Sequence, residues 1–391
     1  MPEQEVQIPS VVVKFHDVPY DDAALQYDWQ RYLDPNAFEA FKQTHQFTNI
    51  TIKQLFTAVS PARIRELALR AQKQDPTYHA PNFLTYFLVL CPLPVNRQKV
   101  AEALDLLPAV EFAYATSGPT KPPGVILGPH EGGVKQKWLD PADDGIDAKF
   151  AWGITGGDGG GDLQFVDIEQ GWTIKPRFAY DHEDLPASIE RIAGTNSDYF
   201  GHGAGVLGVL FAVPGNTDPT IPNRKDCVGI TPFVQKKMVA SILPLNMYQD
   251  QSGVFRYAGR ENAILAAIER LTLGANRRGD VLLLEDQVTH YGYYPPAKGG
   301  QGWADYSDLP VEVETALFDL ISNATANGII VIEAAGNGGM DLDLFNPWNA
   351  PRWGEDSGAI MVAAATSAVP HSYKYASNFG SRMDCYAWGE N

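Results

Sequence analysis

Cysteines, long apolar runs and positive charges are all scarce in this sequence. Its 391 residues include three cysteines, Cys91, Cys227 and Cys385. Widely spaced thiols in odd number fit reduced cysteines better than a disulfide framework or a zinc site. No apolar run approaches the ~20 residues that cross a bilayer. Residues 1–6 are acidic, whereas a signal peptide begins basic and then becomes apolar. We therefore expect a cytoplasmic protein with no membrane span.

The shortage of positive charge is unevenly distributed along the chain. The formal net charge is -17, of which -2 falls in residues 1–125 and -15 in the rest. A surface of this sign repels phosphate, so we expect no nucleic-acid partner and no membrane partner. The Pro- and Gly-rich segment 116–124 lies where the charge changes, as an exposed connector would. We predict a domain over 1–118, a linker over 119–136 and a second domain over 137–391.

The first domain reads as a small α+β module. Ser60 and Pro61 have the pattern of an N-cap followed by Pro at the first helical position, which predicts a helix to about Lys73. Residues 83–90 form an apolar strand pattern, 96–106 a helical one and 109–114 another strand. The module therefore ends in a β-α-β unit.

The second domain alternates strands and amphipathic helices. The sequence predicts strands at 163–168, 237–243 and 281–284. Apolar runs without alternation predict two more, buried on both faces, at 329–335 and 359–365. Between them lie a helix with an apolar face at 264–271 and a helix that Pro310 opens and Gly328 ends. We predict an α/β fold with a mostly parallel sheet between helices, and a site at the carboxyl ends of the strands.

Three segments at such positions carry side chains with chemistry. Asp167 ends an apolar strand in the segment V-D-I-E-Q-G, and His202 opens a Gly-rich helix in G-H-G-A-G-V-L-G. Asn337 follows a buried strand in A-A-G-N-G-G. An acid that orients an imidazole, an imidazole that acts as base and an amide that binds an oxyanion are parts of an acyl-transfer site.

In this order the three segments resemble the subtilisin family of serine proteases, over about residues 137–391. The resemblance implies a serine endopeptidase in which Asp167 orients His202, His202 is the general base and Asn337 binds the oxyanion. The first domain resembles the ferredoxin-like propeptide of that family, which packs on the protease, assists its folding and inhibits it. An accessory domain of unrelated role is the alternative.

The sequence departs from the family pattern at the nucleophile. The family's G-T-S-x-[AS] segment does not occur, and the sequence ends at Asn391. We expect the serine on a second chain or on further sequence. The alternative is a catalytically inactive protein that binds peptides or a partner. Ser357, in a D-S-G segment, is a weak candidate nucleophile, and Ser377 and Ser381 fit turns better.

Substrate and cofactor sites are less clearly marked. Leu284, Glu285 and Asp286 lie where the family lines its substrate cleft, and two carboxylates there would favour basic substrates. A solvated loop is the alternative. No cofactor is expected. A G-x-G-x-x-G match ending at Gly208 follows a polar segment where a dinucleotide site needs a buried strand. An acidic run could bind structural calcium but lacks a ligand pattern, so a solvated face is preferred: Asp140, Asp143, Asp144 and Asp147.

Overall fold

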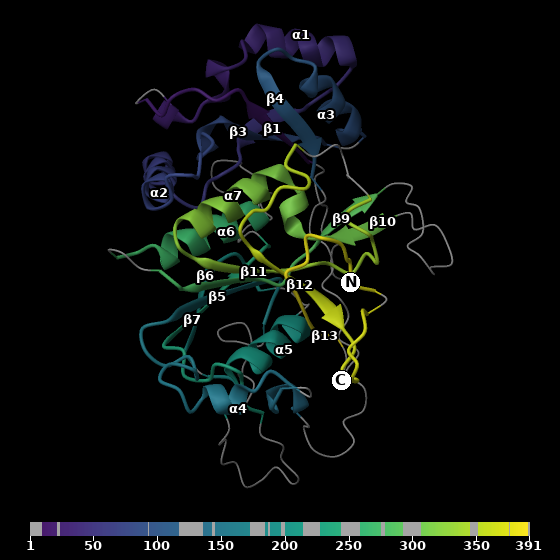
Figure 1. The fold of residues 1–391 in the computed structure, drawn as a ribbon. Helices are drawn as coiled ribbons and strands as arrows, with labels where there is room; N and C mark the ends of the chain where they lie inside the picture. Colours follow the sequence, from purple (N-terminus) through teal and green to yellow (C-terminus); the bar gives the residue numbers. More distant parts are fainter. Residues whose placement is uncertain are drawn as a thin grey trace, which may run out of the picture.

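The structure, a computed structural model, describes most of the chain. The described residues are 10–21, 24–92, 94–116, 136–142, 145–172, 184–186, 188–196, 200–213, 227–243, 259–274, 278–291, 306–344, 351–374 and 376–389. They form an N-terminal unit that lies on the helices covering one face of a large sheet (Figure 1). The predicted boundary at 119–136 lies almost wholly outside the described residues.

The N-terminal unit is a four-stranded antiparallel sheet with three helices. The strands, in spatial order β2-β3-β1-β4, are β1 Ser10–Phe15, β2 Thr51–Gln54, β3 Tyr86–Leu90 and β4 Val110–Ala115. The helices are α1 Pro35–His45, α2 Pro61–Gln74 and α3 Arg97–Asp105. The unit has the β-α-β-β-α-β arrangement with α2 inserted between β2 and β3. This confirms the predicted α+β, ferredoxin-like class.

The helix α2 starts where its sequence predicts. The Ser60 side chain accepts a hydrogen bond from the Arg63 N–H, and Pro61 occupies the first turn. Its apolar side chains Ile64, Leu67 and Ala68 are buried. Strand β1 and helix α1 were not predicted from the sequence, although every β1 residue is buried.

The second unit contains a seven-stranded sheet whose paired strands all run parallel, in the order β13-β12-β11-β8-β5-β7-β6. The strands are β5 Gln164–Glu169, β6 Ile189–Ala193, β7 Lys236–Ser241, β8 Val281–Leu284, β11 Ile330–Ala334, β12 Ile360–Ala365 and β13 Cys385–Trp388. A separate antiparallel pair joins β9 Val288–Tyr291 to β10 Tyr306–Leu309. The predicted mostly parallel sheet is confirmed.

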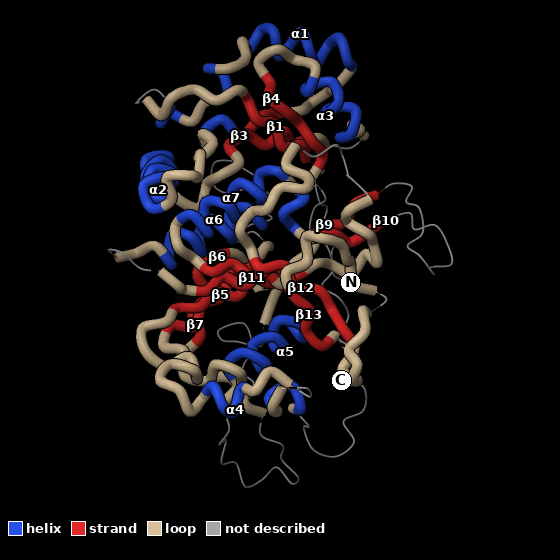
Figure 2. Tube along the Cα trace, viewed as in Figure 1, coloured by secondary structure: helices blue, strands red, loops and turns tan. Residues whose placement is uncertain are grey.

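Helices cover both faces of this sheet (Figure 2). Helices α6 Gly259–Leu271 and α7 Thr315–Ala326 lie on the face toward the N-terminal unit, and α5 Phe200–Phe211 lies on the opposite face near α4 Ala148–Ala151. The apolar side of α6, with Ile264 and Ile268, is fully buried. The order β5-β8-β11 at the centre of the sheet brings the carboxyl ends of these three strands side by side.

The two units are joined by polar contacts as well as by apolar packing. The Asn262 carboxamide of α6 accepts from the backbone N–H groups of Thr57 and Ala58 at 2.7 Å and donates to the Leu55 carbonyl at 3.1 Å. Arg63 of α2 pairs with Glu269 of α6 at 2.5 Å. The N-terminal unit is therefore docked on α6 and α7, on the sheet face opposite α5.

Three expectations about the elements need correction. Pro310 opens a short 3-10 turn, and α7 starts later because Glu314 is extended, at ψ 117°. Strands β11 and β12 are not buried on both faces: Ile330 and Ile360 are 42% and 41% exposed. The polar segment before the Gly-rich helix includes a strand, β6, at the edge of the sheet.

The described residues include no helix that is both long and apolar enough for a membrane crossing.

Candidate active site

The imidazole of His202 is held by a carboxylate, but not by the one that the sequence analysis chose. His202 lies in the first turn of α5, and its Nδ1 is 2.5 Å from Oε1 of Glu169, the last residue of β5. The Glu169 side chain is fully buried and the His202 side chain is 10% exposed. The prediction that Asp167 orients His202 is therefore wrong, because the structure gives that position to Glu169.

Asp167 lies two residues earlier on the same face of β5 and has a different contact. Its Oδ2 accepts a hydrogen bond of 2.8 Å from the indole Nε1–H of Trp172, and both side chains are fully buried. The sequence did contain a signal for Glu169. It is the last acid before the turn at Gly171, so it is the one at the extreme edge of the sheet.

Three carboxyl groups lie at this end of the sheet, of which Asp167 and Glu169 are buried and Glu285 is partly buried. Burial and the neighbouring Glu169 raise the pKa of Asp167 well above its usual value. Burial and the neighbouring Glu285 do the same to the pKa of Glu169, and burial raises the pKa of Glu285. The charge of His202 acts in the opposite direction on Asp167 and Glu285. Such shifted carboxyl groups beside an imidazole are typical of functional sites.

Asn337 follows β11 and is held by Gln287, a residue that the sequence analysis did not select. Gln287 Oε1 accepts from the Asn337 backbone N–H at 3.0 Å and from its side-chain Nδ2 at 3.2 Å. The preceding Gly336 has φ +83°, and the Asn378 side chain donates to the Ala335 carbonyl at 2.6 Å. The Asn337 amide is thus presented, exposed, at the carboxyl end of β11.

A hollow of about 270 Å³ lies over the ends of β8, β11 and β12. Its lining includes Glu285, Gln287 and Asn337, together with small apolar side chains. Of the predicted substrate-binding residues, Glu285 lines this hollow, whereas Leu284 is buried in the core.

Asp286 also lines the hollow, but its charge is already paired. The buried Arg260 guanidinium binds it through Nε and, at 3.3 Å, through Nη2. The role of Asp286 in substrate binding stays a prediction, and the Arg260 pair offsets the attraction that its carboxylate would have for a basic substrate.

The Gly-rich helix α5 is packed closely at one glycine only. A Cβ at Gly203 would lie 2.3 Å from the Gly171 carbonyl oxygen and 2.8 Å from Cδ1 of Trp172. At Gly201, Gly205 and Gly208 a Cβ would meet no atom of the described residues within 4 Å. The close approach needed to seat this helix is therefore confined to the turn that carries His202.

The acidic run considered for calcium is only partly described. Asp143 and Asp144 lie outside the described residues, and Asp140 pairs with Lys149 at 2.6 Å. Among the residues that the structure does describe, no group of three His, Cys, Asp or Glu side chains is placed to hold a metal ion.

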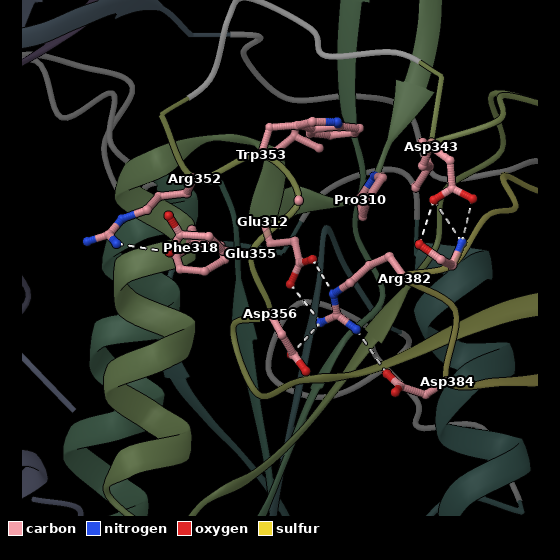
Figure 3. A pocket seen from close by; sticks show the side chains of 14 residues that line it. Pro310, Glu312, Phe318, Asp343, Arg352, Trp353, Glu355, Asp356, Arg382 and Asp384 are labelled. Atoms are coloured by element: carbon pink, nitrogen blue, oxygen red, sulfur yellow. Dashed lines mark hydrogen bonds and ion pairs between the residues drawn. The ribbon is translucent and has the colours of Figure 1, made fainter. Parts of the chain in front are cut away.

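A second hollow, of about 250 Å³, lies beside α7 and above an ion-pair network centred on Arg382 (Figure 3). The guanidinium of Arg382 binds the buried Glu312 carboxylate with two hydrogen bonds, of 2.8 and 3.0 Å. It also pairs with Asp356 at 3.3 Å and with Asp384 at 3.0 Å. This network joins the loop before β12 to the segment before β13.

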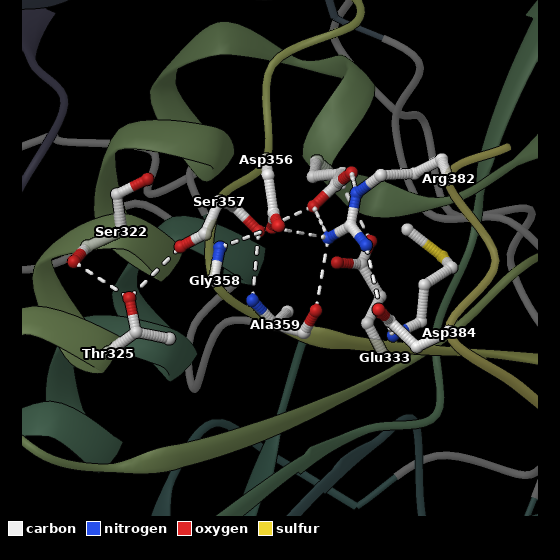
Figure 4. Close-up of polar contacts among 11 residues, drawn as sticks. Ser322, Thr325, Glu333, Asp356, Ser357, Gly358, Ala359, Arg382 and Asp384 are labelled. Atoms are coloured by element: carbon white, nitrogen blue, oxygen red, sulfur yellow. Dashed lines mark hydrogen bonds and ion pairs between the residues drawn. The ribbon is translucent and has the colours of Figure 1, made fainter.

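The three serines considered as nucleophiles or turn residues all make hydrogen bonds that fit structural roles. The Ser357 hydroxyl donates to Glu312 Oε2 at 2.5 Å, and the Ser357 carbonyl accepts from Thr325 at 2.9 Å (Figure 4). The Ser377 hydroxyl accepts from the Ala364 N–H at 2.9 Å, and the Ser381 hydroxyl donates to Asp343 at 2.6 Å. These contacts fit roles in joining loops to the sheet.

Comparisons with known proteins identify no family. A scan against protein-family models and a search of curated proteins find no match. The epidermin leader peptide processing serine protease EpiP from Staphylococcus aureus is similar over 98% of this chain and 75% of its own, at 15% identity and TM-score 0.43. The nisin leader peptidase NisP from Lactococcus lactis is similar over 58% of this chain, at 17% identity and TM-score 0.33. This chain spans 62% of NisP.

These findings correct the identification made from the motifs. The expectation of a member of the subtilisin family that ends before its serine segment is corrected: no family model matches, and EpiP and NisP are described as a leader peptide processing serine protease and a leader peptidase. None of these comparisons supports a nucleophilic serine on a second chain or beyond Asn391.

Proposed function

We propose that this chain is a peptidase that hydrolyses peptide bonds of a protein or peptide substrate. His202 is the general base, Glu169 orients it and Asn337 stabilises the oxyanion. The observation that carries the proposal is the 2.5 Å contact between His202 Nδ1 and the buried Glu169 carboxylate. A carboxylate bound at Nδ1 fixes the tautomer in which Nε2 is the basic nitrogen.

The chemistry is acyl transfer with a nucleophilic hydroxyl. His202 Nε2 accepts the hydroxyl proton as the oxygen attacks the substrate carbonyl, and it later returns the proton to the leaving amine. The negative charge that develops on the carbonyl oxygen is stabilised by the side-chain amide of Asn337. Gln287 supports this role because its side-chain oxygen accepts from the Asn337 backbone N–H and from one N–H of the Asn337 side-chain amide, whose second N–H is left to donate to the oxyanion.

A fluorophosphonate probe tests the proposal and identifies the nucleophile. We expect the protein purified from its natural source to be labelled, and mass spectrometry of the labelled peptide to name the residue that carries the hydroxyl. His202→Ala removes the base and should abolish labelling. His371→Ala is the matched control, because His371 is exposed and its Nδ1 contacts the Thr366 carbonyl.

Two results would count against a peptidase. Equal labelling of the His202→Ala and His371→Ala proteins would remove His202 from the mechanism. No labelling of a folded native protein, together with retained binding of peptides, would favour the alternative of an inactive peptide-binding protein.

We also propose that the N-terminal unit is a propeptide-like regulator of this activity. Its docking on α6 and α7 through Asn262 and the Arg63–Glu269 pair supports a role in folding or inhibition. Arg63→Glu should weaken the docking and raise the labelling rate. Adding Glu269→Arg should restore the docking and return the labelling rate to that of the native protein. An unchanged rate in a folded Arg63→Glu protein would oppose regulation by docking.

A further inference from the structure

Trp172 connects the strand that carries Glu169 to the helix that carries His202. We propose that Trp172 is a positioning residue for His202: its buried ring seats the first turn of α5 through Gly203, while Asp167 and Asn196 hold Trp172 in place. This inference rests on the proposed function, in which the pair of Glu169 and His202 is the base. It also gives Asp167 a role different from the one expected from the sequence.

Trp172 is held at both its backbone and its side chain. The Asn196 carboxamide accepts from the Trp172 N–H at 2.7 Å and donates to the Trp172 carbonyl at 2.6 Å. The indole Nε1–H donates to Asp167 at 2.8 Å. All three side chains are buried. A buried donor that loses its acceptor is costly, so these bonds fix the plane of the ring.

The fixed ring meets α5 beside His202. A Cβ at Gly203 would lie 2.8 Å from the indole Cδ1 and 2.9 Å from Nε1, closer than real Cβ contacts. Farther along α5, Leu207 and Phe211 share a hydrophobic cluster with Trp172. One face of α5, at positions 203, 207 and 211, therefore rests on this ring and its surroundings. Because Gly203 adjoins His202, a shift of the ring moves the imidazole.

The position of His202 matters because its hydrogen bond to Glu169 tolerates little change in distance. The backbone of Glu169 is anchored in a central strand of the sheet, so a movement of α5 changes the distance between His202 and Glu169. A misplacement of about 1 Å can cost a catalytic group roughly 100-fold in rate. Trp172 thus controls the geometry of the base without touching a reacting atom.

The test is the exchange rate of the His202 Nδ1 proton with water, measured by NMR on the full chain labelled with ¹⁵N-histidine. The His202 resonance is assigned by its loss in His202→Ala. Trp172→Phe keeps an aromatic ring but removes the N–H donor, and it should speed exchange about tenfold, the effect of weakening one hydrogen bond. Trp152→Phe is the matched control, because its Nε1 donates to the Ile230 carbonyl at 2.8 Å, and Ile230 contacts α5 at Val209, about two turns beyond His202.

Equal exchange rates in the two Trp→Phe proteins would overturn the inference. If circular dichroism shows that Trp172→Phe does not fold, a pair at position 167 decides. Asp167→Asn keeps an acceptor for the indole and should retain slow exchange, whereas Asp167→Val removes it and should give fast exchange. The same rate in both proteins, fast or slow, would contradict the proposed link.

The exchange measurement needs no turnover. A protein that the fluorophosphonate fails to label can still show the protected His202 proton, and a labelled protein can still lack the dependence on Trp172. Failure of the peptidase proposal and failure of the positioning proposal are therefore separate results.

Discussion

The second unit contains two groups of carboxyl residues, each around one buried glutamate, that differ in the basic side chain the glutamate contacts. In the His202 group, Glu169 contacts an imidazole, with Asp167 and Glu285 nearby. In the Arg382 group, Glu312 contacts a guanidinium through two hydrogen bonds, with Asp356 and Asp384 as further partners. An imidazole gains and loses a proton near neutral pH, whereas a guanidinium keeps its charge.

This difference separates a site of chemistry from a structural joint. Burial raises the pKa of Glu312, while the charge and hydrogen bonds of Arg382 lower it. Within the described part of the chain, Glu169 contacts no such fixed cation, and burial together with Glu285 raises its pKa well above the usual value. A buried carboxyl that faces a titratable base can orient that base for proton transfer. One that faces a permanent cation mainly holds two segments together.

The largest expected effect breaks the His202 group. Glu169→Gln places a side-chain amide against His202 Nδ1. The amide N–H can donate to Nδ1 and so favour the wrong tautomer, in which the imidazole proton is on Nε2. We expect the rate of fluorophosphonate labelling to fall by about 10⁴-fold, the size of effect seen when an orienting carboxylate becomes an amide. Glu190→Gln, in the partly exposed ion pair between Glu190 and Arg270, serves as control. A labelling rate in Glu169→Gln equal to that of the control would show that Glu169 does not orient the base.

The next effect breaks the Arg382 group and acts on stability. Arg382→Met leaves Glu312 buried without its cation, and the free energy of unfolding should fall by about 3–5 kcal/mol. Urea denaturation measures this change. Arg270→Met removes a partner of the more exposed Glu190 and should cost at most about 1 kcal/mol. Equal losses in the two variants would mean that the network is no stronger than a surface pair.

A third prediction concerns a buried carboxyl group that belongs to neither group. Glu261, in the first turn of α6, is 5% exposed, and burial and the neighbouring Glu314 raise its pKa from 4.5 to about 7. Between these two pH values the folded state binds more protons than the unfolded state, so the free energy of unfolding falls as the pH rises. Glu261→Gln removes that dependence, worth about 2–3 kcal/mol between pH 4.5 and 8.

Urea denaturation at pH 4.5 and pH 8 gives this difference directly. The exposed Glu66 provides the control variant Glu66→Gln, which should keep the pH dependence of the native protein. If Glu261→Gln and Glu66→Gln lose stability equally as the pH rises, Glu261 is not protonated in the folded protein near neutral pH.

The comparison also shows which parts of the molecule the sequence could predict. Helix α2 and strands β5, β8 and β12 follow from local patterns of capping and apolar runs, and the structure contains them. The three motif segments placed His202 and Asn337 at the correct ends of their elements. A local sequence pattern is sufficient to predict an element where burial and chain direction alone decide its position.

The sequence could not rank acids that lie on one face of one strand. Asp167 and Glu169 are two residues apart, so both project from the same side of β5. Only the position of α5 decides which of them meets His202, and that position depends on tertiary contacts such as Trp172 with Gly203. The pairing of Glu312 with Arg382 joins residues 70 apart in the sequence and has no local signal either.

The smallest effect concerns Ser357 and brings the two groups into one measurement. Its hydroxyl donates to Glu312, which Arg382 already binds twice, so Ser357→Ala should lower the free energy of unfolding by only about 1–2 kcal/mol. The labelling rate should not change, because Ser357 belongs to the structural group. If Ser357→Ala instead abolished labelling in a folded protein, the nucleophile would lie in the Arg382 group, and the assignment of chemistry to one group and structure to the other would be reversed.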